Sequence, residues 1–297
     1  MSPVDTVDAS SRTRMGYRYE LQTTYRYLRL GIILLGLLLF TGITYQILSD
    51  GGAVLPSVSA YYYSPARGIF VGSLCAVGAC MIIFRGRSDT EDGLLNMSGY
   101  LAFFVAFVPT PRQEAVGTDA TAVIPVDLTA AVTNNSWSVL IVGAIGFALQ
   151  VGVAALSPGR PWHRNPALLL SIAAYTGLLV FFLAARPTYL AVGHYVAALG
   201  LFLGVVGVVG VNAVALARAR GEAGIGPRER WRNRYTLGFA LMVVTIALVL
   251  VVLRPRSEHW VFVLEALLIA QFMAFWITQT VERWRVPDPP QDDLVPG

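Results

Sequence analysis

Long apolar runs separated by short polar gaps dominate this chain of 297 residues. A bilayer core about 30 Å thick needs roughly 20 apolar residues in a helix, and most of the runs approach or exceed that length. The pattern therefore predicts an all-α fold, a polytopic membrane helix bundle with about eight transmembrane helices. The predicted spans are Tyr27–Leu48, Arg67–Phe84, Leu94–Val108, Ser136–Leu156, Ala167–Ala185, Leu190–Ala217, Leu237–Leu253 and Trp260–Thr280.

The third predicted span, Leu94–Val108, is short for a full crossing. It crosses only if the helix continues into Pro109 or if the bilayer thins locally. The alternative is a chain of seven spans in which this segment is re-entrant.

Charge supports eight spans and gives an orientation. The chain has no lysine, and its 22 basic residues are all arginines. If the gaps alternate between the two sides of the membrane, 17 arginines fall on one side and 5 on the other. Arginine and lysine are enriched in cytoplasmic loops, so this bias predicts that both termini lie in the cytoplasm and that the protein resides in the plasma membrane.

Three regions follow from this topology. Residues 1–26 form a polar cytoplasmic arm that we expect to be mobile, residues 27–280 form one transmembrane domain, and residues 281–297 form a cytoplasmic tail. The tail carries too little apolar surface to fold by itself, so we expect it to be disordered. The hydrophobic content of 55%, the mean hydropathy of +0.59 and the net charge of +4 fit a membrane protein rather than a nucleic-acid partner.

Glycine spacing indicates which helices pack closely. Membrane helices associate through small residues that let backbones approach. Two stripes recur every three or four residues, and we expect both to face other helices. They are Gly200, Gly204, Gly207 and Gly210 in the sixth span, and Gly68, Gly72, Ala76 and Cys80 in the second.

Polar residues at membrane depth are costly and are therefore candidates for function. Glu265 is the sharpest, because it stands inside the eighth span between apolar neighbours. We expect it to pair with Arg67 or His194, which are predicted at similar depth on the outer side. With Tyr63 and Tyr45 these residues would line an outward-facing pocket for a ligand. The alternative is a structural ion pair, or a neutral acid, that holds the bundle together.

The opposite side of the membrane offers little comparable chemistry besides Asn96, Gln279 and solvated arginines. We expect the arginine-rich segment between the sixth and seventh spans to fix topology and to contact anionic lipids. The long external segment Pro109–Asn135 could cover the outer face as a lid. The arginines assigned to lipid or topology contacts are Arg228, Arg230, Arg232 and Arg234.

Familiar catalytic and metal sites are not supported. The three histidines, His163, His194 and His259, divide between the two sides of the membrane, so they cannot form a three-histidine zinc site. Ser136 and His194 lack the Gly-x-Ser-Gly context of a rhomboid-like dyad. We predict no catalytic residues, no metal and no cofactor.

One segment is distinctive. Residues 57–72 read Ser-Val-Ser-Ala-Tyr-Tyr-Tyr-Ser-Pro-Ala-Arg-Gly-Ile-Phe-Val-Gly, followed by Asp92–Gly99 and by Val108-Pro109-Thr110. The pattern resembles a group of bacterial, actinobacterial-like multi-pass membrane proteins of unknown function. They share a Ser-x-Ser-x-Tyr-Tyr-Tyr-x-Pro-x-Arg entry to the second span. The resemblance covers about a fifth of the chain and implies a membrane bundle but no activity.

Three functions remain open. The favoured one is a protein that binds, senses or transports a lipid or small amphiphile through an outward-facing polar pocket. The second is an intramembrane enzyme acting on a lipid or isoprenoid head group, with Glu265 and His194 as acid and base. The third is a structural or accessory subunit, which a small-residue stripe facing lipid would favour.

Overall fold

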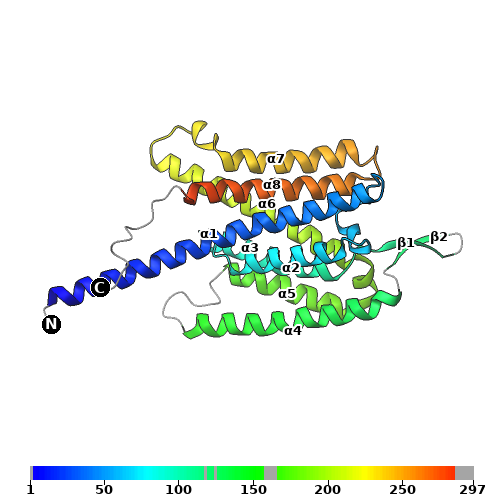
Figure 1. Ribbon diagram of the computed structural model, residues 1–297, viewed down its shortest axis with the longest axis horizontal. Helices are drawn as coiled ribbons and strands as arrows, with labels where there is room; N and C mark the ends of the chain where they lie inside the picture. Colours follow the sequence, from blue (N-terminus) through cyan, green and yellow to red (C-terminus); the bar gives the residue numbers. More distant parts are fainter. Residues whose placement is uncertain (1–2, 117–118, 124–125, 157–165, 285–297) are drawn as a thin grey trace.

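The computed structural model describes residues 3–116, 119–123, 126–156 and 166–284. Within them, eight α-helices run back and forth beside one another (Figure 1). The elements are α1 Pro3–Ser49, the 3-10 turn η1 Ser59–Tyr63, α2 Arg67–Ile83, α3 Asp89–Phe107, β1 Arg112–Val116, β2 Asp119–Val123, α4 Val126–Leu156, α5 Pro166–Ala184, α6 Arg186–Glu222, the 3-10 turn η3 Glu229–Trp231, α7 Arg234–Leu248, the π-helical turn η4 Val249–Leu253 and α8 Trp260–Trp284.

The all-α bundle predicted from the apolar runs is confirmed in its coarse form, since each of the eight predicted segments falls on a helix. Among the residues that the structure describes, five helices are long and apolar enough to cross a membrane: those of α1, α4, α6, α7 and α8. Two shorter apolar helices, Arg67–Ile83 and Leu168–Ala184, accompany them. The architecture is that of a helical membrane bundle with one small hairpin.

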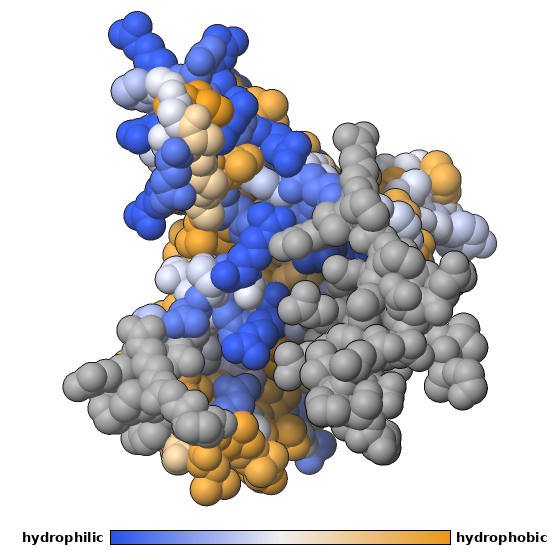
Figure 2. All heavy atoms as spheres, turned by 90° about the vertical axis from the view of Figure 1, so that its left-hand side faces the viewer, coloured by the Kyte–Doolittle hydropathy of each residue, from blue (hydrophilic) through white to orange (hydrophobic). Residues whose placement is uncertain are grey.

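The bundle has two chemically different ends. The start of α1 and the last turn of α8 lie at the end that also carries the α6–α7 connection, which we call the arginine-rich end; the β1–β2 hairpin marks the opposite, hairpin end (Figure 1). Figure 2 looks at the arginine-rich end, where hydrophilic residues gather at the top, over the α6–α7 connection.

Helix α3 lies in the middle of the bundle, where it packs on α2, α4, α5 and α6. It begins at Asp89 rather than at Leu94 because Ser88 caps it: the Ser88 hydroxyl accepts from the Glu91 amide at 3.2 Å, and the Glu91 carboxylate accepts from the Arg87 amide at 2.8 Å. At 1.5 Å per residue, its 19 residues span about 28 Å, close to the thickness of a bilayer core.

Glycines bring α6 against α3, as the stripe predicted. A Cβ atom added at Gly200 would lie 2.7 Å from Leu101, and one at Gly207 would lie 3.1 Å from Leu94. Between them, Gly204 faces Ser98. The stripe therefore packs inside the bundle. A stripe facing lipid would have favoured a structural or accessory subunit, and this part of α6 does not have one.

The stripe predicted for α2 is wrong at its two glycines. Cβ atoms at Gly68 and Gly72 would meet nothing within 4 Å. The close contact of α2 is made instead by Gly78, which crosses Gly99 of α3: each added Cβ would lie 2.7 Å or less from the other glycine's carbonyl oxygen. The four-residue spacing marks one face of α2, but the helix is oriented so that a different face, which carries Gly78, lies against α3.

Several boundaries differ from the prediction. Helix α1 already begins at Pro3, so the polar arm is helical, and its mobility stays a prediction. Helix α8 continues to Trp284, and the remainder of the predicted disordered tail lies outside the described residues.

The predicted external loop Pro109–Asn135 is largely ordered secondary structure. An antiparallel hairpin pairs Arg112 with Val123 and Val116 with Asp119, and α4 begins at Val126, ten residues earlier than expected. The hairpin projects beyond the helix ends instead of covering them as a lid (Figure 1).

Candidate functional site

Glu265 lies in α8 near the hairpin end and is only 8% exposed. Its partner is Ser59, the first residue of η1. The Ser59 amide donates to Oε2 at 3.2 Å, and the Ser59 hydroxyl donates to Oε1 at 3.0 Å. A single residue 206 positions away in the sequence thus satisfies both carboxylate oxygens.

Further contacts fix η1 and the segment before it against α8. The Phe262 amide donates to the Pro56 carbonyl at 3.0 Å, and the Tyr61 hydroxyl accepts from the Leu55 amide at 3.3 Å. Burial raises the pKa of Tyr61, so this phenol stays neutral at physiological pH. The Ser-x-Ser-x-Tyr-Tyr segment therefore forms a hydrogen-bonded turn that holds Ser59 against Glu265.

A cavity of about 100 Å³ opens beside this carboxylate, between α1, α2, α3, α6 and α8. A cavity needs roughly 10–15 Å³ on this scale to hold one water, so the space is several times larger than one molecule of water. Only Ser59, Ser73 and Glu265 are polar among its lining residues. The rest of its wall is hydrocarbon, thioether and glycine, which favours an apolar occupant over water.

The cavity is elongated along the bundle. On α8 its lining runs from Glu265 to Met273, nine residues that cover about 12 Å of helix. The polar groups stand at the hairpin-end side, and Met81 and Phe272 belong to its deeper, apolar wall.

Ser73 of α2 is an unusual member of this lining. It is 1% exposed, and its hydroxyl has no hydrogen-bond partner among the described residues. A buried hydroxyl without a partner costs about 1–3 kcal/mol, and a group that enters the cavity can remove that cost. Glu265 also keeps acceptor capacity, because a carboxylate offers about four lone-pair sites and Ser59 occupies two.

The pairing expected for Glu265 is wrong. Arg67 is exposed at the start of α2, where its guanidinium lies 4.1 Å above the Tyr62 ring and donates to the Tyr62 hydroxyl. His194 is buried in α6, and its Nδ1 lies 2.6 Å from the Val108 carbonyl oxygen. Each has a local partner instead of the carboxylate, and neither lines the cavity.

The two predicted tyrosines also lie elsewhere. The Tyr63 hydroxyl donates to the Thr110 carbonyl at 2.8 Å, which ties η1 to the segment that follows α3. Tyr45 is 72% exposed on α1. Of the five predicted ligand residues, Glu265 alone lines the cavity, and the acid–base pair of Glu265 and His194 is not assembled.

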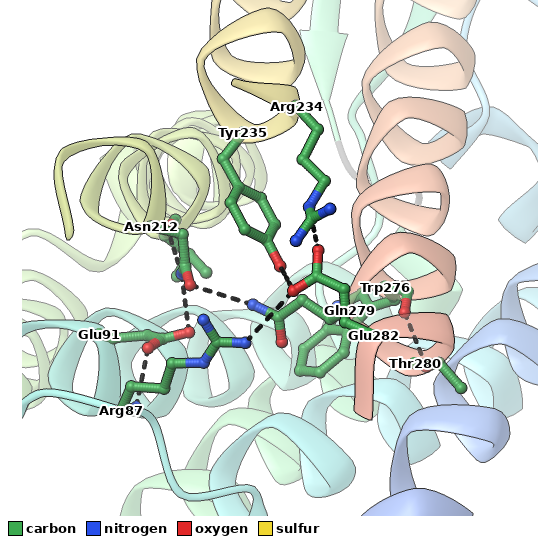
Figure 3. Close-up of polar contacts among 10 residues, drawn as sticks. Arg87, Glu91, Asn212, Arg234, Tyr235, Trp276, Gln279, Thr280 and Glu282 are labelled. Carbon is green, nitrogen blue, oxygen red and sulfur yellow. Dashed lines mark hydrogen bonds and ion pairs between the residues drawn. The ribbon is translucent and has the colours of Figure 1, made fainter. Parts of the chain in front are cut away.

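A second polar cluster lies toward the arginine-rich end and was missed by the prediction (Figure 3). Its inner part joins three helices. The Asn212 amide of α6 donates to the Glu91 carboxylate of α3 at 2.8 Å, and the Gln279 amide of α8 donates to the Asn212 oxygen at 3.1 Å. All three side chains are at most 2% exposed.

The outer part of this cluster gathers around Glu282 of α8. Arg234 and Tyr235 both point at its carboxylate (Figure 3), with the Tyr235 hydroxyl donating at 2.8 Å and Arg234 forming an ion pair. Arg87 lies 3.9 Å from the same carboxylate. The cluster therefore ties α7, α8 and the start of α3 together at one end of the bundle.

The sequence held a signal for this cluster that the prediction did not use. Asn212 interrupts an otherwise apolar run, and an amide at membrane depth needs a partner. Glu91 was assigned to a polar gap, because the predicted third span began after it. Gln279 by itself indicates no site, because its partners Asn212 and Glu91 come from two other helices.

The arginines predicted to contact lipid lie in the α6–α7 connection and at the start of α7. Arg228, Arg232 and Arg234 are exposed, and Arg230 is half-buried. Arg234 is engaged by Glu282 as described. Within the described residues, no group of three or more His, Cys, Asp and Glu side chains could hold a metal ion.

No protein-family model, curated protein or solved structure matches this chain. Only its own residues and geometry bear on its function.

Proposed function

We propose that the protein spans the plasma membrane eight times with both termini in the cytoplasm. The division of arginines, 17 against 5, supports this orientation, as does the position of the start of α1 and the last turn of α8 at the arginine-rich end (Figure 1). The hairpin end then faces outward, and with it the polar end of the cavity.

In this membrane the protein binds a single-chain amphiphile in the cavity beside Glu265. One observation carries the proposal: an elongated apolar space of about 100 Å³ has a buried carboxylate and an unpartnered buried hydroxyl among its lining residues. The apolar wall fits a hydrocarbon chain, since burying each CH₂ contributes about 0.8 kcal/mol.

The polar end of the ligand follows from the same groups. Glu265 offers only acceptors when ionised, and Ser73 can both donate and accept. A hydroxyl or amino head group on the chain would satisfy both residues, whereas a carboxylate head would be repelled by Glu265. Alcohols and amines with a short hydrocarbon chain are therefore the expected class, because a cavity of about 100 Å³ is smaller than the roughly 150 Å³ cavity that holds benzene. Such binding would serve sensing or transport.

The test is mass spectrometry of small molecules that co-purify when the protein is extracted in native lipid discs. Ser73→Ala is the sharpest variant, because the Ser73 hydroxyl makes no hydrogen bond with the described residues that could be lost. Glu265→Gln is the second, and Glu258→Gln is the matched control on an exposed carboxylate.

An enriched amphiphile in the wild type and in Glu258→Gln, reduced about tenfold in Ser73→Ala and in Glu265→Gln, supports the proposal, since a buried head group left without its partner costs about 1–3 kcal/mol. Identical bulk lipid in all four proteins contradicts it. Thermal unfolding of each variant separates lost binding from lost structure.

A further inference from the structure

A second, basic pocket of about 320 Å³ lies at the arginine-rich end, between the last turns of α6 and the start of α7. Its lining residues are Leu216, Arg220, Arg232, Asn233 and Arg234. Three of these five side chains are guanidinium groups, and none is acidic. It lies at the opposite end of the bundle from the amphiphile cavity and is independent of it.

Hydrogen bonds within the protein hold this pocket in shape. Arg220 donates from one terminal nitrogen to the Arg232 carbonyl at 2.9 Å and to the Glu229 carbonyl at 3.5 Å. Asn233 caps α7, accepting from the amides of Tyr235 and Thr236 at 3.0 Å each. Its frame is therefore set by backbone contacts before any ligand arrives.

The three guanidinium groups differ in how many of their N–H donors are already bonded within the protein. Arg234 is oriented by Glu282, which partly neutralises it (Figure 3). The Arg232 guanidinium forms no bond with any residue that the structure describes, and it is exposed. Arg220 uses a single terminal nitrogen for its two backbone contacts. Several N–H donors of Arg220 and Arg232 thus remain available for an anion.

Arginine matches phosphate especially well. Its planar fork donates two parallel hydrogen bonds to a pair of phosphate oxygens. A pocket with three such groups and no carboxylate in its lining is complementary to a group that carries several negatively charged oxygens.

The surroundings indicate that this phosphate belongs to a lipid. The pocket includes Leu216, and two large apolar side chains nearby in the chain are exposed: Trp231 at 41% and Leu237 at 62%. Arg234 is also the first residue of a helix that is long and apolar enough to cross a membrane. A group at this position meets the head-group layer, where anionic lipids attract arginine.

We propose that the pocket formed by Arg220, Arg232 and Arg234 binds the phosphate of an anionic phospholipid. The proposal goes beyond general attraction between an arginine-rich loop and a membrane, because it predicts different contributions to lipid binding from arginines of equal charge. Arg232 lines the pocket, whereas Arg228, four residues earlier and also exposed, does not.

The experiment measures how the purified full-length protein, in neutral detergent, binds phosphatidylglycerol and phosphatidylcholine by native mass spectrometry. Arg232→Gln and Arg220→Gln test the pocket, and Arg228→Gln removes the same charge outside it. Arg234 is left intact because it also holds Glu282. Thermal unfolding checks that each variant keeps its fold.

We expect the wild type to retain phosphatidylglycerol over phosphatidylcholine. Arg232→Gln and Arg220→Gln should each weaken phosphatidylglycerol binding about tenfold, since charge-assisted hydrogen bonds are lost, and Arg228→Gln should change it less than about twofold. Inorganic phosphate at millimolar concentration should compete with the lipid.

Two results overturn the proposal. Equal weakening by Arg228→Gln and Arg232→Gln would mean diffuse attraction by net charge rather than a pocket. Binding of inorganic phosphate with no preference for phosphatidylglycerol over phosphatidylcholine would assign the pocket to a free anion instead of a lipid.

Discussion

The crossing of α2 and α3 at Gly78 and Gly99 gives a prediction with a built-in control. A Cβ atom at Gly99 would lie 2.5 Å from the Gly78 carbonyl oxygen and 2.9 Å from Ile82. Because the nearest obstacle is backbone, no side-chain rotation relieves it, and the two helices must move apart. Overpacking of this kind costs about 1–3 kcal/mol.

Gly72→Ala is the control on the same helix pair. A Cβ atom there meets nothing within 4 Å, so only the helix propensity changes, in favour of alanine by about 1 kcal/mol. The same gain applies at Gly99, and it cancels in the comparison. Gly99→Ala should therefore be less stable than Gly72→Ala by about 1–3 kcal/mol.

The assay is reversible unfolding of the purified protein in mixed micelles of increasing sodium dodecyl sulfate content, which gives the free energy of unfolding for each variant. Equal stability of Gly99→Ala and Gly72→Ala would show that α2 and α3 do not approach through these glycines. That result would also remove support for the cavity, because α2 and α3 both line it.

Three further predictions concern the polar contacts and the topology. Asn212→Ala leaves the buried Glu91 carboxylate without its side-chain donor and should lower the free energy of unfolding by about 2 kcal/mol; no change in the same micelle titration would contradict this. Ser59→Ala removes the hydroxyl donor to Glu265 but keeps the amide donor, so it should cost less, about 1–2 kcal/mol, and a loss equal to that of Asn212→Ala would mean that the amide contact is lost too. A green fluorescent protein fused to the C-terminus should fluoresce and an alkaline phosphatase fused there should be inactive, because we propose that this terminus is cytoplasmic; the reverse pattern would invert the orientation.

Much of the fold follows from the apolar runs. Their lengths predicted a helix in every one of the eight places where the structure has one. The ends of the helices did not follow, because local hydrogen bonds decide them. Ser88 caps α3 six residues before its apolar run begins, and this places Glu91 inside a helix instead of in a gap.

The candidate site was half predicted, because depth along a helix can be read from sequence but rotation about its axis cannot. Glu265 was identified from its depth, and it does line a cavity. Arg67 and His194 were chosen at matching depth, yet their nearest partners are Tyr62 and the Val108 carbonyl.

The true partner of Glu265 could not be found in this way. Ser59 lies in a short 3-10 turn outside the predicted spans, and only the tertiary fold brings it to α8. The cavity itself has no sequence signal, because it arises where five helices fail to fill the space between them.

The most direct test of the central claim is photo-crosslinking with a short-chain alcohol that carries a diazirine on its hydrocarbon tail. The protein is held in native lipid discs, and the modified peptides are identified by mass spectrometry. We predict that the label concentrates on cavity-lining segments of α2 and α8, between Phe70 and Met81 and between Glu265 and Met273, and that Ser73→Ala reduces it there. Labelling confined to exposed apolar faces, such as that of Leu149 and Val153 on α4, and unchanged by Ser73→Ala, would contradict an amphiphile site inside the bundle.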